Sequence, residues 1–317
     1  MKILANDGIA PIGKQQLEAA GFEVVTETVA QEDLIQAIND NNYVALLVRS
    51  ATKVRQDIID ACPGLKLIGR GGVGMDNIDV AYAREKGLHV INTPASSSQS
   101  VAEQVIAHLF GLARFLYDAN RQMPVSGVSD FKTLKKKYAK GIELRGKTLG
   151  VIGIGRIGQA TAKYALGCGM KVVAYDPFMK NVSIPVQVAD QTVNVEINTI
   201  DLDSLLSQSD FITLHIPAQA DGKAVIGNDE FAKMKNGVMI VNAARGGVID
   251  EDALIANLDN GKVAAAALDV FVGEPAPRED LMKHPKLSLT PHTGAATLEA
   301  QDRIGEELAD QIIALLS

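Results

Sequence analysis

The segment Val151-Ile152-Gly153-Ile154-Gly155-Arg156-Ile157-Gly158 decides how the fold is interpreted. An apolar run leads into the glycines and a helical pattern follows them, which predicts a strand, a tight turn and a helix. Gly153 allows the turn, Gly155 lets a pyrophosphate approach the backbone, and Gly158 lets the helix pack on the strand. Because the first N–H groups of a helix lack partners, they can bind the phosphates. The segment therefore predicts a dinucleotide site.

An acidic residue follows at the spacing that selects the nucleotide. Asp176 comes directly after the next apolar run, Lys171–Tyr175. A carboxylate about twenty residues past the glycines can accept hydrogen bonds from the adenosine ribose. The same negative charge would repel a 2′-phosphate, so the sequence favours NAD over NADP.

The composition is that of a globular protein with room for two domains. The chain has 317 residues, of which 47% are hydrophobic and 22% charged, and a formal net charge of −7. A net negative charge disfavours binding to nucleic acid or to an anionic membrane. Cys62 and Cys168 have no metal-ligand spacing, and the N-terminus has no signal-peptide pattern. We therefore expect a cytoplasmic protein without a metal site.

Short apolar runs alternate with helical patterns along most of the chain. Continuous apolar runs are typical of parallel strands that are covered on both faces. The alternation predicts an α/β fold with parallel sheets. The strands are expected at residues 44–48, 149–152, 238–241 and 263–268, and helices at 15–20, 157–166 and 251–257.

Three segments interrupt the alternation. A polar cluster at residues 93–98 indicates a domain junction. After it, the pattern predicts one long helix over residues 100–122. Residues 182–200 alternate between apolar and polar side chains, which predicts a hairpin that turns near Asp190.

Three later residues could carry chemistry. Arg245 follows a predicted strand, and an arginine there can bind a carboxylate through two hydrogen bonds. His292 could act as an acid or base because its ordinary pKa lies near neutrality, and a carboxylate such as Glu274 could orient it. The spacing of these two residues does not show that they touch, so a structural role for His292 stays open.

These motifs together resemble the D-isomer-specific 2-hydroxyacid dehydrogenase family. The resemblance rests on the glycine segment with Asp176, and on the segments Val241–Gly247, Ala267–Pro275 and Pro291–Ala295. It implies that Arg245 holds the substrate carboxylate and carbonyl, that His292 donates or accepts the proton, and that Glu274 raises the basicity of the histidine. It also implies a set of contacts to NAD, from Gly153, Gly155, Arg156, Ile157, Gly158, Asp176, His215, Ile216, Pro217, Ala243, Ala244, Arg245, Asp269, His292, Gly294 and Ala295.

The resemblance also implies the architecture. A flavodoxin-like substrate-binding domain would comprise residues 1–96 and 294–317, and a Rossmann-type NAD-binding domain would be inserted as residues 97–293. Hinge motion would close the domains around the substrate and exclude water. Members of the family form homodimers through the cofactor domain, so we expect a homodimer or a higher homo-oligomer.

Within the family, the sequence is most similar to members that oxidise D-3-phosphoglycerate to 3-phosphohydroxypyruvate in serine biosynthesis. The segments Val48–Lys53, Gly69–Asn77 and Asn92–Pro94 carry this similarity. Their cations suit a substrate with both a phosphate and a carboxylate. The expected substrate-binding residues are Arg49, Ser50, Lys53, Arg70, Gly71, Gly72, Val73, Arg245 and His292.

Two alternatives stay open from the sequence. Another enzyme of the family, acting on glyoxylate, hydroxypyruvate or a larger 2-oxo acid, would share every catalytic residue. An NAD-sensing binding protein similar to the corepressors of this fold would share the motifs without the activity. The chain ends near the end of the catalytic unit, so we expect a short form without a regulatory domain.

Overall fold

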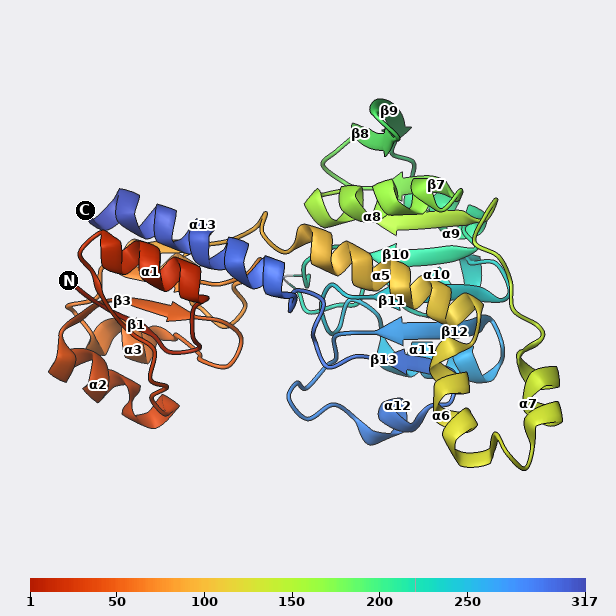
Figure 1. Ribbon diagram of the computed structural model, residues 1–317, viewed down its shortest axis with the longest axis horizontal. Helices are drawn as coiled ribbons and strands as arrows, with labels where there is room; N and C mark the ends of the chain where they lie inside the picture. Colours follow the sequence, from red (N-terminus) through yellow and green to blue (C-terminus); the bar gives the residue numbers. More distant parts are fainter. Residues whose placement is uncertain (220) are drawn as a thin grey trace. The chain divides into compact units, whose positions relative to one another are not determined.

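The computed structural model describes residues 1–219 and 221–317, and these divide into two compact units (Figure 1). The first unit comprises Met1–Ser100 and Ala295–Ser317, and the second comprises Val101–Gly294. The boundaries predicted from the sequence were 96–97 and 293–294.

The first unit has a five-stranded parallel sheet of order β2-β1-β3-β4-β5. Its strands are β1 (Lys2–Ala5), β2 (Glu23–Val25), β3 (Tyr43–Val48), β4 (Leu67–Arg70) and β5 (His89–Asn92). Its helices are α1 (Pro11–Ala19), the short 3-10 helix η1 (Gln31–Asp33), α2 (Leu34–Asn41), α3 (Gln56–Ala61), α4 (Val80–Glu85) and α13 (Leu298–Leu316). The order is that of flavodoxin-like sheets, in which the strand order reverses between β1 and β3.

Helices cover both faces of this sheet. Leu17 of α1 and Leu308 of α13 pack on one face with Ile3 and Leu67. The other face is covered by residues of α2, α3 and α4. Figure 1 shows α13 lying along α1, although about 280 residues of chain separate them.

The second unit has a six-stranded parallel sheet of order β13-β12-β11-β10-β6-β7. Its strands are β6 (Thr148–Ile152), β7 (Lys171–Tyr175), β10 (Phe211–Leu214), β11 (Val238–Asn242), β12 (Val263–Leu268) and β13 (Leu287–Leu289). Its helices are α5 (Ser98–Ala113), α6 (Leu116–Ser126), α7 (Phe131–Tyr138), α8 (Arg156–Gly167), α9 (Leu202–Gln208), α10 (Asn228–Lys233), α11 (Glu251–Asp259) and α12 (Glu279–Lys283). Here the strand order reverses between β6 and β10.

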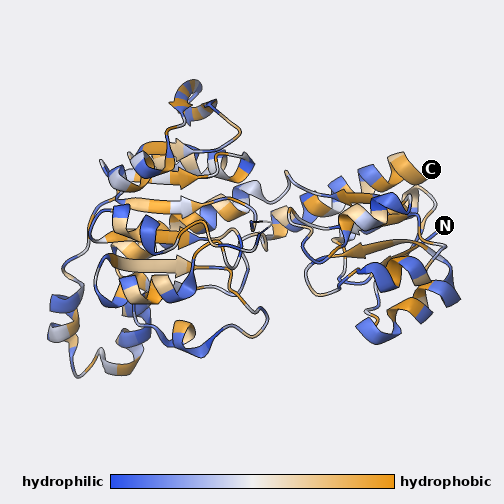
Figure 2. Cartoon of the chain, turned by 180° about the vertical axis from the view of Figure 1, so that it is seen from behind, coloured by the Kyte–Doolittle hydropathy of each residue, from blue (hydrophilic) through white to orange (hydrophobic). Residues whose placement is uncertain are grey.

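The two sheets confirm the predicted α/β class with parallel strands. Their strands are apolar along most of their length, and the helices carry polar outer faces, as the hydropathy colours of Figure 2 show. Burial on both faces explains why the strands could be recognised as unbroken apolar runs. Across residues 1–219 and 221–317, no helix combines the length and apolar character that crossing a membrane requires.

The predicted hairpin is confirmed, and the predicted long helix is wrong. Strands β8 (Asn181–Val188) and β9 (Gln191–Asn198) form an antiparallel pair that turns at residues 189–190. The helix expected over residues 100–122 is broken between α5 and α6. Phe115 has a left-handed backbone there (φ 57°), and its ring lies 6.2 Å from the ring of Tyr138. The spacing of apolar residues continues through this point, so the sequence pattern alone does not reveal that the helix ends there.

We predict that Gly13→Ala destabilises the first unit. A Cβ at Gly13 would lie 2.4 Å from the carbonyl oxygen of Gly305, because α1 and α13 pack backbone against backbone. Overpacking of this kind costs about 1–3 kcal/mol, which exceeds the advantage of about 1 kcal/mol that alanine has over glycine in a helix. Urea unfolding measures the change.

The matched control is Gly167→Ala in α8, where an added Cβ meets no described atom within 4 Å. It should leave the stability unchanged or raise it slightly. A Gly13→Ala variant as stable as the control would show that the two helices can separate without cost.

Candidate functional site

The glycine segment lies at the reversal point of the second sheet. Gly153 follows β6 with a left-handed backbone (φ 90°), and a Cβ there would lie 2.5 Å from the carbonyl oxygen of His215, which follows β10. Ligands of α/β proteins bind where the carboxyl ends of strands diverge in this way. The glycine turn that the sequence predicts to bind a dinucleotide therefore lies at a position typical of ligand sites.

The start of α8 is open to a ligand. Gly155 is the N-cap residue, and no described side chain caps the helix. An added Cβ at Gly155 would meet no described atom within 4 Å, whereas one at Gly158 would lie 2.1 Å from the carbonyl oxygen of Gly153. Arg156 and Ile157 form the first turn. Gly158 thus serves packing, and the space beside Gly155 fits a pyrophosphate on the helix N-terminus.

Asp176 lies against the same glycine segment. Its Oδ2 accepts a hydrogen bond of 3.0 Å from the backbone N–H of Ile154, and its Oδ1 accepts from the N–H groups of Phe178 and Met179. Each carboxylate oxygen has two lone-pair sites, so Oδ2 can still accept one bond from a ribose hydroxyl. The geometry fits the predicted adenosine end of the site.

His215 is a neutral histidine beside the glycine turn. Burial lowers its pKa to about 3, so the imidazole carries no charge at physiological pH. Its Nε2 lies 3.2 Å from Oγ1 of Thr213, while its buried Nδ1 has no hydrogen-bond partner among the described residues. Ile216 and Pro217 continue the chain past β10. A buried polar atom without a protein partner here fits a hydrogen bond to the cofactor.

The segment after β11 presents Arg245. Asn242 shapes this turn, because its side chain accepts from the N–H of Ala244 and donates to the carbonyl oxygen of Arg245. A Cβ at Gly246 would lie 2.2 Å from the carbonyl oxygen of Phe271, so only glycine allows this close approach. Arg245 is therefore held on a rigid turn next to the segment that carries Glu274.

The structure brings Glu274 and His292 together. Oε2 of Glu274 lies 2.7 Å from Nδ1 of His292, and Oε1 accepts from the N–H of Phe271 at 2.8 Å. A carboxylate bound to Nδ1 places the imidazole proton there and leaves the Nε2 lone pair available. The His292 side chain is 40% exposed, so that nitrogen can be reached. The pair has the arrangement of an oriented acid–base group.

Asp269 holds the segment that carries His292. Its carboxylate is 1% exposed and accepts four hydrogen bonds, from Nε2 of Gln104, Oγ1 of Thr290, and the N–H groups of Thr293 and Gly294. These bonds fix the chain on both sides of His292, whose backbone is left-handed (φ 53°). Gln104 and Thr290 were missed from the sequence because no local pattern links residues so far apart.

Part of the expected substrate set lies at the reversal point of the first sheet. The Asp7 carboxylate follows β1 and accepts from the N–H groups of Arg49 and Thr52, at 2.6 and 3.1 Å, and from the Thr52 hydroxyl. Asn77 donates to the carbonyl oxygens of Arg49 and Thr52. The segment after β3 is therefore held by side chains that sequence reasoning did not select.

A cavity of about 550 Å³ opens beside this segment within the first unit. Its walls include Asp7, Arg49, Gly71 and, from α13, Gln301 and Asp302. Partial burial lowers the pKa of the Arg49 guanidinium, and the Asp7 carboxylate acts in the opposite direction. An anion bound there would favour the charged form of Arg49.

The other expected substrate residues of this unit are not on the cavity wall. The Arg70 guanidinium folds onto its own turn, where Nη1 lies 3.3 Å from the carbonyl oxygen of Gly71 and 1.6 Å from where a Cβ at Gly72 would stand. Ser50, Lys53 and Val73, the other three expected substrate residues of this unit, also lie off the cavity wall. Among the expected cofactor residues, Ala295 belongs to the first unit and the others to the second.

Comparison with known proteins identifies relatives of the whole chain. The family model described as "D-isomer specific 2-hydroxyacid dehydrogenase, NAD binding domain" matches residues 106–294. A hydroxypyruvate reductase from Thermotoga maritima is 45% identical over 92% of this chain and 90% of the relative. A D-3-phosphoglycerate dehydrogenase from Archaeoglobus fulgidus is 41% identical over 99% of this chain. The chain spans 57% of the length of that relative.

A solved structure shares the complete fold. The NAD⁺-bound 3-phosphoglycerate dehydrogenase of Entamoeba histolytica superimposes with a TM-score of 0.77 at 30% identity, over 99% of this chain and 94% of that one.

We predict that Gly155→Ala weakens NAD binding without destabilising the protein. The residue has an ordinary backbone (φ −66°) and open space beside it, so the methyl group can clash only with a ligand. Loss of one close phosphate approach should raise the Kd for NAD about tenfold or more. Calorimetric titration with NAD measures the effect, and thermal unfolding without NAD reports stability.

Gly153→Ala is the contrasting variant, since its left-handed backbone and short approach to His215 predict a lower Tm. Unchanged NAD affinity in Gly155→Ala would place the pyrophosphate elsewhere.

Proposed function

Since the chain belongs to the D-isomer-specific 2-hydroxyacid dehydrogenase family, we propose that it oxidises D-3-phosphoglycerate to 3-phosphohydroxypyruvate with NAD. The membership confirms the resemblance found in the sequence, and it confirms NAD as the cofactor. The activity is that of an NAD-dependent D-2-hydroxyacid dehydrogenase. The identity of the hydroxy acid, and a place in serine biosynthesis, are the parts that we propose.

The contact between His292 and Glu274 supports the proposed reaction most directly. When bound, NAD supplies an acceptor for the hydride that leaves C2 of the substrate. Nε2 of His292 takes the hydroxyl proton, while the Glu274 carboxylate, 2.7 Å from Nδ1, stabilises the imidazolium that forms. In the reverse direction the same nitrogen returns the proton.

Arg245 positions the substrate in this proposal. Its guanidinium can hold a carboxylate through two parallel hydrogen bonds, which fixes C2 relative to His292. The turn that carries it is rigid because Asn242 bridges its backbone and because Gly246 lies against Phe271. Nη1 of Arg245 also donates to the carbonyl oxygen of Ala244 at 2.7 Å, so the guanidinium is already restrained before the substrate binds.

The cavity of the first unit supports a phosphorylated substrate. Arg49 is a partly buried cation on its wall, and Gly71 lies beside it. A partly desolvated guanidinium favours a phosphate, which offers two or more acceptor oxygens. A substrate without a phosphate would leave this cation without that partner.

Hydroxypyruvate reduction is the second candidate. It is favoured by the match to the Thermotoga maritima enzyme, which covers nine-tenths of both chains, whereas the phosphoglycerate dehydrogenase of Archaeoglobus fulgidus is matched over just over half of its length. Both reactions use the same proton and hydride transfers, so the residues of the second unit suit either.

Assembly into a homodimer or larger homo-oligomer is part of the proposal. Helices α6 and α7 and the turn between them expose large apolar side chains, which supports an interface in the second unit. The most exposed are Leu116, Val125, Val128 and Phe131.

We predict that D-3-phosphoglycerate is oxidised with a kcat/KM far above that of D-glycerate, and that Arg49→Ala removes the preference. Loss of a charge-assisted phosphate contact should lower kcat/KM for the phosphorylated acid about 100-fold, with a smaller effect on D-glycerate. NADH absorbance measures both directions, with hydroxypyruvate and 3-phosphohydroxypyruvate as substrates for reduction.

Arg84→Ala, an exposed arginine on α4, controls for loss of a surface charge in the same unit. If hydroxypyruvate is reduced at least as well as its phosphorylated form and Arg49→Ala changes neither, the second candidate replaces the first.

We predict that Glu274→Gln lowers kcat about 100-fold while leaving NAD affinity unchanged, because the amide cannot stabilise the protonated imidazole. The matched control is Glu251→Gln. Glu274 accepts from the N–H of Phe271, and Oε1 of Glu251 accepts from the N–H of the next residue, Val272. Among the described contacts, Glu251 makes none with His292. Equal effects of the two substitutions would assign Glu274 a purely structural role.

A further inference from the structure

A second pocket lies at the opposite edge of the first sheet from Arg49. It has a volume of about 560 Å³ and surrounds the amino ends of β4 and β5, where Lys66 precedes one strand and His89 begins the other. The substrate-side residues Arg70 and Asn92 lie at the carboxyl ends of these strands. Four residues at ~3.3 Å each separate the two edges by roughly 10–13 Å, so a ligand in this pocket would not touch the substrate.

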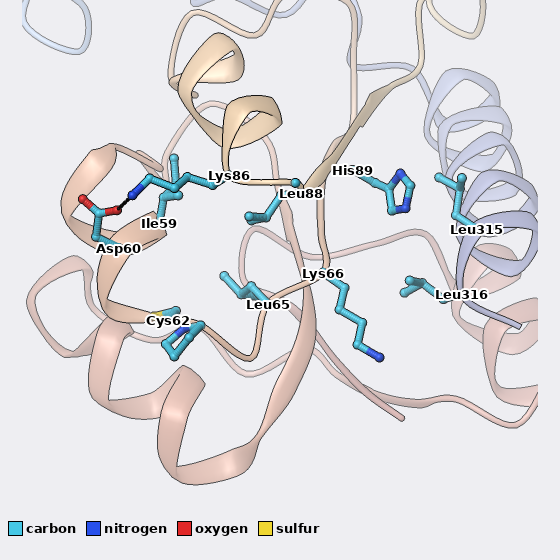
Figure 3. Close-up of a pocket in the computed structure, with 12 residues that line it drawn as sticks. Ile59, Asp60, Cys62, Leu65, Lys66, Lys86, Leu88, His89, Leu315 and Leu316 are labelled. Atoms are coloured by element: carbon cyan, nitrogen blue, oxygen red, sulfur yellow. Dashed lines mark ion pairs between the residues drawn. The ribbon is translucent and has the colours of Figure 1, made fainter.

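The walls of the pocket combine apolar side chains with charged ones. Ile59 and Leu65 come from the end of α3 and the chain after it, Leu88 from the turn before β5, and Leu315 and Leu316 from the end of α13 (Figure 3). His89 pairs with Leu67, which packs with α13, so His89 belongs to the face that α13 covers. The pocket thus joins three segments that are distant in the sequence.

The charged groups of the pocket leave an excess of positive charge. Its cationic side chains are Lys66 and Lys86, with His89 as a third basic group, and its single acid is Asp60. The Asp60 carboxylate is already engaged by the ammonium group of Lys86 at 2.8 Å and by the Tyr82 hydroxyl. Within residues 1–219 and 221–317, Lys66 has no carboxylate at ion-pair distance. The pocket therefore offers an ammonium group beside apolar walls, in a protein whose net charge is −7.

We propose that this pocket binds an organic anion with an apolar body, such as a medium-chain alkyl carboxylate. The carboxylate contacts Lys66 and the alkyl chain packs on Leu65, Leu88 and Leu315. The volume lies within the range of about 300–1,000 Å³ found for small-molecule sites, which combine apolar walls with a few polar groups. An inorganic anion has no apolar body to pack on the leucine side chains. An alcohol has no negative charge to pair with the Lys66 ammonium group.

The test is calorimetric titration of the full chain with octanoate, beside acetate and octanol. Octanoate should bind with one site, and the other two at least tenfold more weakly. Lys66→Ala should weaken octanoate binding about tenfold or more. Leu315→Glu, which places a like charge on the exposed wall, should abolish it. Thermal unfolding confirms that both variants are folded.

Lys171→Ala is the matched control. Like Lys66, Lys171 is an exposed lysine at the amino end of a strand, in this case β7 of the second unit, and its substitution should leave octanoate binding unchanged. Octanoate affinity that is absent, or that is the same in Lys66→Ala and Leu315→Glu as in the unmodified protein, would overturn the proposal. Binding retained in both variants would mean that the carboxylate occupies another site, such as that of Arg245.

Discussion

The buried carboxylate of Asp269 is the constraint on which the candidate site depends. A charge that is 1% exposed is stable in a protein interior only when hydrogen bonds replace its water. Four donors do so: the Gln104 side chain of α5, the Thr290 hydroxyl just after β13, and the backbone N–H groups of Thr293 and Gly294, which follow His292. Because all four donors bind one carboxylate, α5, the end of β13 and the segment that carries His292 are fixed together.

Asp7 has the same task in the first unit. It follows β1 at the reversal point of the sheet and accepts from backbone N–H groups of the segment that carries Arg49. In both units, then, a carboxylate at the carboxyl edge of the sheet accepts hydrogen bonds from backbone N–H groups and from side chains. Because these two carboxylates are bound by hydrogen-bond donors, they do not need to form ion pairs with Arg49 or Arg245, the cations proposed to bind an anionic substrate.

Local sequence patterns predicted the fold class and much of the cofactor site, whereas contacts between residues far apart in the sequence could not be predicted. Gly153, Gly155 and Asp176 were recognised because each lies within one strand–turn–helix unit. The break at Phe115 was missed because it accompanies a contact with Tyr138. Gln104 bonds to Asp269 across 165 residues, and Asp7 reaches Arg49 across 42. Such pairs follow from sheet topology, which periodicity alone does not specify. The contact between Glu274 and His292 was a hypothesis of the same kind, and here the geometry supports it.

The proposed reaction uses residues of the second unit, and the proposed phosphate contact uses a residue of the first. This distribution explains why the substrate is harder to assign than the reaction. In the proposed reaction, proton transfer and carboxylate binding use groups of the second unit, which the family model matches over residues 106–294. Relatives that act on different acids can share these groups unchanged. Discrimination between a phosphate and a hydroxyl on C3 depends instead on whether the first unit presents a desolvated cation. In our proposal, Arg49, whose backbone N–H is bound by Asp7 on the wall of a cavity, is therefore the residue whose environment would decide the substrate.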